Sequence, residues 1–467
     1  MSGPHTLGSL LAVVLLGASD AAGAATSLIL DAGPHLFLDD HLIAEQSFLS
    51  RTVQRPAKLP EPLITGGAGG DANFQPYVTV IRNPDTGRFR VWYGVPENAS
   101  QSHLATMESA DGLRWERPHR VLRDPQRIQF GASVVDRGGA FLPADQRFVF
   151  AFWEGGGMRL AVSPDGLDWR MLAPGVVWEH NHDINALFWD PLRRHYAAIG
   201  SVFLEDPRWT GKRRIPYQSV SRDLLTWEEK WRIIAPKLSA PIEQGETEFY
   251  SMAGVIARGS LLVGLVKVLR DDLNATPGRS AAEMGSADRK AAGLGYTVLA
   301  WSRDGRTWQR DHEPFLINDS DPARWDHAMA WGDCQVVVGD EIFLYYGGYR
   351  RGHKVARFDE RQIGLARFPL DRYAAREADL NRGRLLTKPV RLRGAGLTVN
   401  ARVGGELRVR LVDVIGDSLP TFDWVEVTGD GAALPVGWTR SLANLGDQPV
   451  RIEFELRHAQ LFGLTVR

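Results

Sequence analysis

Five short polar segments of the sequence each stand directly before a run of residues with the pattern of a β-strand. Four of them contain at least one carboxylate, at 70–75, 180–183, 246–250 and 325–327, and the fifth, 128–131, contains none. Carboxylates that share one site can divide acid and base roles, because a neighbouring negative charge raises the pKa of one of them and keeps it protonated. Hydrolysis of a glycosidic bond uses such a pair. The recurrence of acids at one place in the pattern therefore indicates a candidate site.

A phrase of seven residues with the form Ser-x-Asp-x-x-x-Trp recurs at 109–115, 163–169, 221–227 and 302–308. Its tryptophans are 54, 58 and 81 residues apart, and the longest interval becomes 58 residues when the polar stretch 270–292 is set aside. In this phrase the Asp can accept hydrogen bonds from backbone N–H groups two residues on, a Gly supplies a positive φ angle, and the Trp covers an apolar face. The phrase is typical of a strand that ends in a tight turn.

Two further strand-like runs precede each copy of the phrase, such as 77–81 and 89–93 in the first unit. A fifth unit, from Cys334 to Tyr373, lacks the phrase but keeps the alternating runs. Five such units predict an all-β chain with a five-bladed β-propeller across residues 71–380. A β-sandwich or two stacked barrels would also be all-β, but neither has a reason to repeat one phrase at one period.

The two ends of the chain differ from the repeated part. Residues 7–16 are mostly apolar and are followed by small residues ending in Ala22-Gly23-Ala24, so we expect residues 1–24 to be a signal peptide and the protein to be secreted or periplasmic. An Ala-rich terminus of a cytoplasmic protein is the alternative. We expect residues 25–70 to form an N-terminal segment that packs on the propeller. Short alternating runs between Gly-rich turns predict a small C-terminal antiparallel β-sandwich over 381–467.

The composition argues against several classes of partner. The 467-residue chain has 55 Lys+Arg against 56 Asp+Glu, a net charge of −1, and no basic stretch, so we expect no nucleic-acid partner. No segment has the 18 or more apolar residues of a membrane span, so we expect no membrane partner either. The single cysteine, Cys334, cannot form an internal disulfide or a thiolate cluster. The oligomeric state does not follow from these numbers.

Metal binding has weak support in the sequence. His180 and His182 could be two ligands of a metal ion, but no third ligand with suitable spacing accompanies them, and zinc sites use three or four. We therefore expect no metal and no cofactor, and only a calcium ion held by carboxylates of the channel stays open as an alternative.

The predicted propeller explains how segments far apart in sequence could form one site. The first strand of each blade lines the central channel, and the loop that enters this strand opens at one end of the channel. Aromatic rings in these loops could stack on sugar faces, and polar groups could bind hydroxyls. The candidate substrate-binding residues are His182, Glu246, Tyr250, Trp325, Asp326 and His327, together with Asp40 of the N-terminal segment.

With its five predicted blades, its Ser-x-Asp-Gly-x-x-Trp endings and its acids in blades one, three and four, the chain resembles the furanosidase superfamily of glycoside hydrolase families 32, 43, 62 and 68. The resemblance implies that Asp71 is the base or nucleophile, Asp183 orients and tunes the site, and Glu248 is the acid. In those families the first Asp stands in an Asp-Pro turn, whereas Asp71 precedes Pro76 by five residues, and Asp39-Asp40 is a rival.

A second resemblance is closer. The segments 37–43, 248–252 and 385–389 are similar to uncharacterised bacterial secreted proteins described as family-32-like. Together the two resemblances imply a secreted glycoside hydrolase that cleaves a glycosidic bond of an oligo- or polysaccharide, with furanosides among the candidates.

Two alternatives to this function stay open. A propeller of the same kind could bind carbohydrate without cleaving it. The repeated phrase also resembles the Asp-box of sialidases, but that fold has six blades and an arginine triad, and this sequence has five units.

Overall fold

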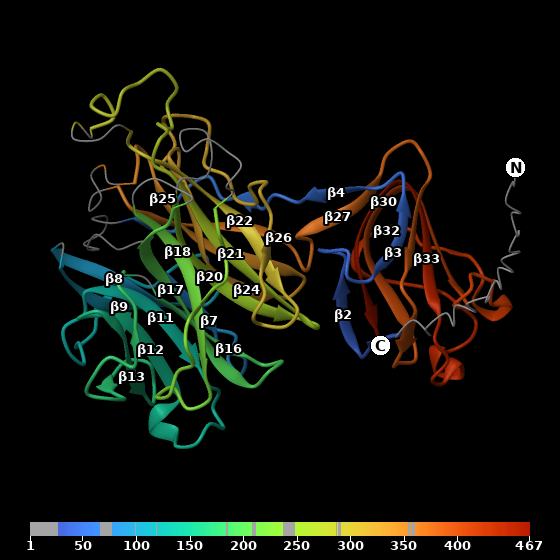
Figure 1. Ribbon diagram of the computed structural model, residues 1–467, viewed down its shortest axis with the longest axis horizontal. Coiled ribbons are helices and arrows are strands. Elements are labelled where there is room, and N and C mark those ends of the chain that lie inside the picture. The colour runs from blue at the N-terminus through green and yellow to red at the C-terminus, as the bar shows by residue number, and fades with distance from the viewer. Residues whose placement is uncertain are drawn as a thin grey trace, which may run out of the picture.

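A computed structural model describes the chain over most of its length (Figure 1). The described residues are 27–65, 77–98, 100–117, 119–183, 185–207, 212–236, 248–285, 287, 291–353, 355 and 360–467. Over these residues the protein is all-β, with short 3₁₀ turns as its helical elements, which confirms the prediction of an all-β chain. The predicted signal peptide, Asp71 and Glu246 lie outside the described residues, as do the side chains of residues 248–250.

Five antiparallel units follow one another along the chain, and the strands of each unit pair in chain order, except that the last strand of the second unit pairs with the third strand of that unit. The first unit contains β7 (Val78–Arg82), β8 (Phe89–Asn98), β9 (Gln101–Ser109) and β10 (Arg120–Val121). The second contains β11 (Phe130–Asp136), β12 (Phe148–Trp153), β13 (Gly157–Ser163), β14 (Arg170–Met171) and β15 (Trp178–Glu179). The third contains β16 (Asn185–Asp190), β17 (His195–Glu205), β18 (Lys212–Ser221) and β19 (Trp231–Arg232).

The last two units share one sheet, because β22 and β24 are joined by a parallel pair between Gly295 and Met329. The fourth unit contains β20 (Glu248–Arg258), β21 (Leu261–Arg270), β22 (Leu294–Ser302) and β23 (Gln309–Arg310). The fifth contains β24 (Met329–Val338), β25 (Glu341–Tyr349) and β26 (Gln362–Pro369). Its outer edge is completed by β5 (Ala57–Lys58) and β6 (Ile64–Thr65), which both pair with β26.

The first strands of the units are tied to one another by bonds that involve a side chain. The Thr79 hydroxyl of β7 accepts a bond from the Val134 N–H of β11 (3.2 Å), and the Ser133 hydroxyl of β11 accepts one from the Leu187 N–H of β16 (2.8 Å). The Val80 N–H of β7 donates to Cys334 Sγ of β24 (3.4 Å), and Gln335 Nε2 of β24 donates to Gly254 O of β20 (2.7 Å). These ties place the first strands in the order β16, β11, β7, β24, β20, an arrangement like that of a β-propeller.

The apolar core lies between neighbouring units rather than inside any one of them. Alternate residues of a strand point to opposite faces of its sheet, so each sheet buries one face against each neighbour. Val91 and Tyr93 of β8, for example, share a buried cluster with Phe343 and Tyr345 of β25, which belong to the fifth unit. Removal of this apolar area from water is the main stabilising contribution to the arrangement.

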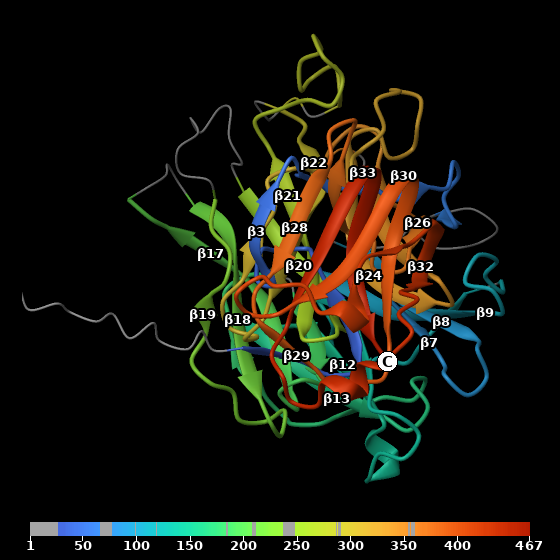
Figure 2. The same cartoon turned by 90° about the vertical axis from the view of Figure 1, so that its right-hand side faces the viewer.

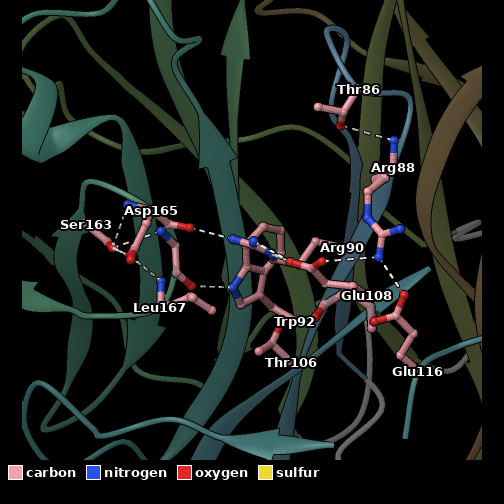
Figure 3. A network of polar contacts seen from close by, with 12 residues as sticks. Thr86, Arg88, Arg90, Trp92, Thr106, Glu108, Glu116, Ser163, Asp165 and Leu167 are labelled. Atoms are coloured by element: carbon pink, nitrogen blue, oxygen red, sulfur yellow. Dashed lines mark hydrogen bonds and ion pairs between the residues drawn. The ribbon is translucent and has the colours of Figure 1, made fainter. Parts of the chain in front are cut away.

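The repeated phrase forms a turn, called here the aspartate turn, that reaches the unit before it (Figure 3). In the second unit the Asp165 carboxylate accepts a bond from the Leu167 N–H (2.9 Å), and the Ser163 hydroxyl accepts one from the Gly166 N–H (2.9 Å). The Gly166 carbonyl then accepts a bond from Trp92 Nε1 of the first unit (2.8 Å). The turn therefore closes its own strand and holds two units together.

Gly166 is required at this turn for two reasons. Its φ angle is +76°, and a Cβ atom added to it would lie 2.7 Å from the Trp92 ring. We expect Gly166→Ala to lower the free energy of unfolding by about 2–4 kcal/mol, from backbone strain together with the clash in a packed interface. Urea unfolding followed by tryptophan fluorescence measures the change.

Gly138→Ala is the matched control, because Gly138 also has a positive φ angle (+90°) but has nothing within 4 Å of an added Cβ. In Gly138→Ala only backbone strain acts, so its free energy of unfolding should fall by about 1–2 kcal/mol. Equal losses in the two variants would show that contact between the units adds nothing at Gly166.

The aspartate turns predict a loss of stability in acid. Bonds from the N–H groups of Thr226 and Leu225 lower the pKa of Asp223 to about 2. Slight burial acts to raise the pKa of Asp304, but the N–H groups of Thr307 and Arg306 outweigh it and lower the value to about 2. Because the pKa is lower in the folded state, each carboxylate stabilises the fold above its ordinary pKa of 3.8, and this contribution is lost as the pH falls towards 2.

We therefore expect the free energy of unfolding to decline between pH 4 and pH 2. Each turn should contribute less than about 1 kcal/mol, since these carboxylates are largely exposed and screened by solvent. Asp304→Asn should make the decline shallower, which chemical unfolding at several pH values would measure. If the free energy of unfolding of Asp304→Asn fell as steeply with pH as that of the wild type, protonation of Asp304 would not be a cause of the decline.

The C-terminal residues form a second sheet beside the five units, and Figure 1 shows it as a separate lobe. Its two longest strands, β30 (Leu397–Val412) and β33 (Arg451–Val466), pair along their whole length (Figure 2). The other C-terminal strands are β27 (Ala374–Ala378), β28 (Gly383–Thr387), β31 (Val425–Glu426) and β32 (Gly429–Pro435), with β29 (Val390–Leu392) in a small separate sheet.

The N-terminal segment contributes strands to both lobes. β2 (Gly33–Leu36), β3 (Ile43–Ser47) and β4 (Ser50–Val53) pair with β33, β28 and β27 of the C-terminal sheet, and β1 (Leu28–Leu30) pairs with β29. Ion pairs join the lobes at the far ends of β20 and β22. Arg258 binds Asp371 (2.6 Å), and Arg51 binds Asp311 (2.8 Å).

Candidate functional site

A cavity of about 290 Å³ lies between the first strands, and residues of β7, β11, β16, β20 and β24 all line it. Its two ends differ in chemistry. Near the beginnings of the strands the wall is polar and includes Tyr77, Asn185, Ser251, Lys267 and Asp333. Towards the ends of the strands it is mostly apolar and includes Ile81, Phe188, Trp189 and Ile256. The polar end is therefore the candidate site.

The loop that enters β16 places Asp183 beside this end. His182 Nδ1 lies 2.6 Å from Asp183 Oδ1, and the His182 ring lies against Phe203 of β17 with centroids 5.5 Å apart. Asn181 exchanges two hydrogen bonds with the backbone of Phe203, of 2.8 and 2.9 Å. These contacts fix the loop to β17, so Asp183 is held two residues before the strand that lines the cavity.

The environment of Asp183 keeps it ionised. Burial acts to raise the pKa of this carboxyl, but the close contact with His182 and the positive charge of Arg214 outweigh burial, so the pKa is lower than the ordinary value. The side chain is still 20% exposed. A fixed carboxylate that stays negative can orient a substrate or stabilise positive charge, but it is a poor proton donor.

His180 has a different part in the same loop. It is 4% exposed, lies within hydrogen-bond distance of Asn185 Oδ1, and packs on Trp178 with ring centroids 4.9 Å apart. Burial lowers its pKa to about 4, against the opposing effect of the bond to Asn185, so the ring is neutral at neutral pH. His180 therefore holds Asn185 in place at the start of β16 without adding charge to the site.

Lys267 of β21 and Asp333 of β24 form a buried ion pair on the cavity wall. Their side chains are 1% and 5% exposed, and Lys267 Nζ also lies 5.3 Å from the centre of the Tyr77 ring. Burial raises the pKa of Asp333 to about 6, although Lys267 opposes the shift. Asp333 stands in a β-bulge between the paired residues Gly332 and Cys334, and a bulge re-aims the side chain of its extra residue.

The predicted residues of the fifth unit are almost fully buried. Asp326 is 2% exposed, and its Oδ2 accepts bonds from Lys58 Nζ (2.7 Å) and the Tyr346 hydroxyl (3.0 Å). Trp325 stacks on the same Tyr346 with centroids 5.3 Å apart. His327 is 2% exposed and lies 3.0 Å from the Thr276 hydroxyl. The structure places these three residues in contacts that hold the loop before β24.

Asp40 lies away from the polar end of the cavity. It pairs with Arg376 of β27 (2.7 Å), and the neighbouring Asp39 binds Arg303, which follows the end of β22. The beginning of β22 pairs with Met329, at the end of the molecule where Asp326 stands. The nine residues of β22 span roughly 25 Å, so the structure does not bring Asp40 together with the other candidates.

Glu248 is the first residue of β20, so its backbone stands at the entrance of a strand that lines the cavity. Tyr250 falls in a β-bulge of the same strand, between the paired residues Phe249 and Ser251. Asp71 and Glu246 are outside the described residues, and so are the side chains of Glu248 and Tyr250.

Sequence reasoning missed Lys267 and Asp333. A signal for Lys267 is present, since it is a lone charge in the otherwise apolar run Leu261–Leu269. Asp333 similarly interrupts the apolar start of β24. A charge inside a buried strand indicates a partner in the interior, because an unpaired buried charge is costly.

Within the described ranges, no group of three or more His, Cys, Asp or Glu residues has an arrangement that could hold a metal ion. None of the described elements is a helix long and apolar enough to cross a membrane.

No family model and no curated protein matches the chain. Among solved structures, a protein named "Glycoside hydrolase" is 15% identical, covers 68% of this chain and 92% of its own, and has a TM-score of 0.44. A β-1,2-mannobiose phosphorylase from Listeria innocua is 12% identical, with coverages of 69% and 97% and a TM-score of 0.42. An exo-β-1,3-galactanase from Phanerochaete chrysosporium is 9% identical, with coverages of 88% and 100% and a TM-score of 0.41.

Likenesses of this size do not decide the fold or the activity of this chain. The residues at the polar end of the cavity and the sequence motifs that lead into it indicate the function of this chain more directly.

Proposed function

We propose that the protein is a glycoside hydrolase that cleaves a glycosidic bond of an oligo- or polysaccharide at the polar end of the central cavity. Glu248 is the general acid, Asp183 orients the substrate and tunes the acid, and Asp71 is the base or nucleophile. Furanosides are among the candidate substrates. The proposed reaction uses no metal and no cofactor.

One observation carries the proposal: two of the acids singled out in the sequence stand at the entrances of strands that line one cavity. Asp183 stands two residues before β16, and β20 begins at Glu248. The lowered pKa of Asp183 suits a carboxylate that remains charged beside a second carboxyl group, because its negative charge raises the pKa of that neighbour and favours a protonated acid.

The architecture that fits this proposal is a five-bladed propeller, with one blade for each antiparallel unit and the cavity as its channel. The five blades would lie between residue 71 and the end of β26, and the C-terminal sheet, which also takes in β27 and the strands β2, β3 and β4 of the N-terminal segment, would be the β-sandwich. A signal peptide over 1–24 would direct the protein to the periplasm or the exterior, where polysaccharides occur.

The test is an assay of sugar release from a panel of polysaccharides and synthetic glycosides, with Glu248→Gln as the comparison. We expect the wild-type protein to release sugar from at least one substrate. Binding on a glycan array without release from any substrate would favour a carbohydrate-binding propeller instead.

A further inference from the structure

Two buried polar atoms on the cavity wall have no hydrogen-bond partner among the described residues. They are Asp333 Oδ2, an acceptor, and Asn185 Nδ2, a donor. Both residues are 7% exposed, and both line the cavity. Buried polar groups are rarely left unpaired because the cost of desolvation is then not recovered, so these two atoms indicate an occupant of the cavity.

The other polar groups of the wall are already engaged and do not supply these partners. Thr79 donates to Ala132 O (2.6 Å), and Ser133 accepts from the Leu187 N–H. Gln335 donates to Gly254 O and lies 3.0 Å from the Tyr373 hydroxyl. The wall therefore leaves one donor, Asn185 Nδ2, and one acceptor, Asp333 Oδ2, for a molecule that enters the cavity.

The charges of the wall select a neutral occupant. Lys267 already balances the Asp333 carboxylate, and His182 Nδ1 lies 2.6 Å from the Asp183 carboxylate, so both acids near this end have a basic partner and a further cation would add charge at a buried site. An anion would face the free oxygen of Asp333 and would be repelled. A hydroxyl group meets both needs, because it can donate to Asp333 Oδ2 and accept from Asn185 Nδ2.

The cavity is also limited in size. Its volume of about 290 Å³ extends over both the polar and the apolar end, so the polar end alone is smaller. One sugar residue fits that space, and a chain of several does not.

We propose that the polar end of the cavity is a subsite for one uncharged, polyhydroxylated sugar residue, whose hydroxyls bind Asp333 Oδ2 and Asn185 Nδ2. This inference deepens the proposed function and rests on it. It names the substrate class as a neutral sugar, as opposed to a uronic acid or an amino sugar, and it adds two specificity-determining residues to the site.

Calorimetric titration of the full-length protein with single sugars tests the subsite. The neutral probes are D-galactose, D-glucose, D-mannose, D-xylose and L-arabinose, and the charged probes are D-galacturonate and D-glucosamine. We expect at least one neutral sugar to bind and both charged sugars to bind more weakly.

Two nearly isosteric variants identify the contacts. Asn185→Asp keeps an oxygen for His180 but loses the donor, and Asp333→Asn keeps an oxygen for Lys267 but removes the free carboxylate oxygen. Each should weaken binding of the neutral sugar roughly tenfold, the effect of one lost hydrogen bond in a buried site. Thermal melts establish that the variants are folded, and Asn185→Asp suffices if Asp333→Asn does not fold.

Asp136→Asn is the matched control, since Asp136 lines the opposite end of the same cavity and both of its oxygens are bound by Arg147. It should leave sugar binding unchanged. The subsite is refuted if no sugar binds, if a charged sugar binds at least as tightly, or if a folded Asn185→Asp variant binds like the wild type. Sugar release together with any of these results would leave the proposed hydrolase standing, whereas neutral sugar binding without release would overturn only the hydrolase.

Discussion

Replacing Glu248 with Gln is expected to lower kcat on natural glycosides by about 10²–10⁴-fold while leaving the thermal melt unchanged. Gln has nearly the same shape as Glu but has no proton to give to the leaving oxygen, and general acid catalysis contributes a factor of this size. Initial rates of sugar release, measured for both proteins at saturating substrate, give the ratio directly.

Substrates whose leaving groups differ in their need for protonation distinguish a general-acid role of Glu248 from other roles. A nitrophenyl glycoside has a leaving group that departs without protonation, so loss of the acid should affect it far less than a natural glycoside. Glu229→Gln is the matched control, because Glu229 is an exposed carboxylate outside the candidate site and its exchange should leave both rates unchanged. Equal losses on both types of substrate would contradict the acid role and would indicate a nucleophile or a base.

The strand pattern of the repeated part could be predicted from the sequence, because it is a local property. The aspartate turn recurs with the same bonds in its four copies, and its Asp accepts the expected N–H groups in each. The reason why Gly166 is needed could not be predicted in full. Its positive φ angle follows from the turn, but the Trp92 ring that would meet its Cβ comes from another unit.

The candidate site was harder to predict, because it depends on which side chains a loop turns inward. The sequence places Asp326 in the same position as Asp183, directly before a first strand. In the structure Lys58, from a strand far away in the chain, binds Asp326 and buries it, whereas Asp183 keeps a fifth of its surface exposed. No pattern near Asp326 reveals that partner.

The roles of Asp39 and Asp40 in the N-terminal segment could not be predicted from the sequence either. Asp39 and Asp40 were rivals for the base because carboxylates in a loop look alike in a sequence. Their partners, Arg303 and Arg376, instead join the N-terminal segment to the two lobes. Lys267 and Asp333 could be suspected as unusual residues in buried strands, but only the arrangement of β21 beside β24 shows that they pair.

The Lys267–Asp333 pair gives the largest expected effect on stability. Lys267→Met keeps the length of the side chain but removes its charge, and this leaves the Asp333 carboxylate buried without its partner. Loss of one partner of a buried pair costs about 3–5 kcal/mol, so we expect the free energy of unfolding at pH 7 to fall by that amount. Urea unfolding at constant pH measures the change.

The pH dependence of this loss identifies its cause. Burial already raises the pKa of Asp333 to about 6, and removal of Lys267 would raise it further. Because this pKa is higher in the folded than in the unfolded chain, stability is fully present below the ordinary value of 3.8 and declines as the pH rises, by about 1.4 kcal/mol per pH unit. The free energy of unfolding of Lys267→Met should therefore be about 2–3 kcal/mol higher at pH 5 than at pH 7, about twice the change expected for the wild type, in which Asp333 already ionises near pH 6.

The double variant Lys267→Met, Asp333→Asn removes both charges and completes the test. With no carboxyl group left to protonate, it should lose this pH dependence and regain much of the stability lost in the single variant at pH 7, since replacing both partners of a buried pair is often close to neutral. A double variant as unstable at pH 7 as Lys267→Met would show that packing of the lysine side chain, and not its charge, accounts for the loss. The ion pair would then have no special part in holding β21 against β24 beside the cavity.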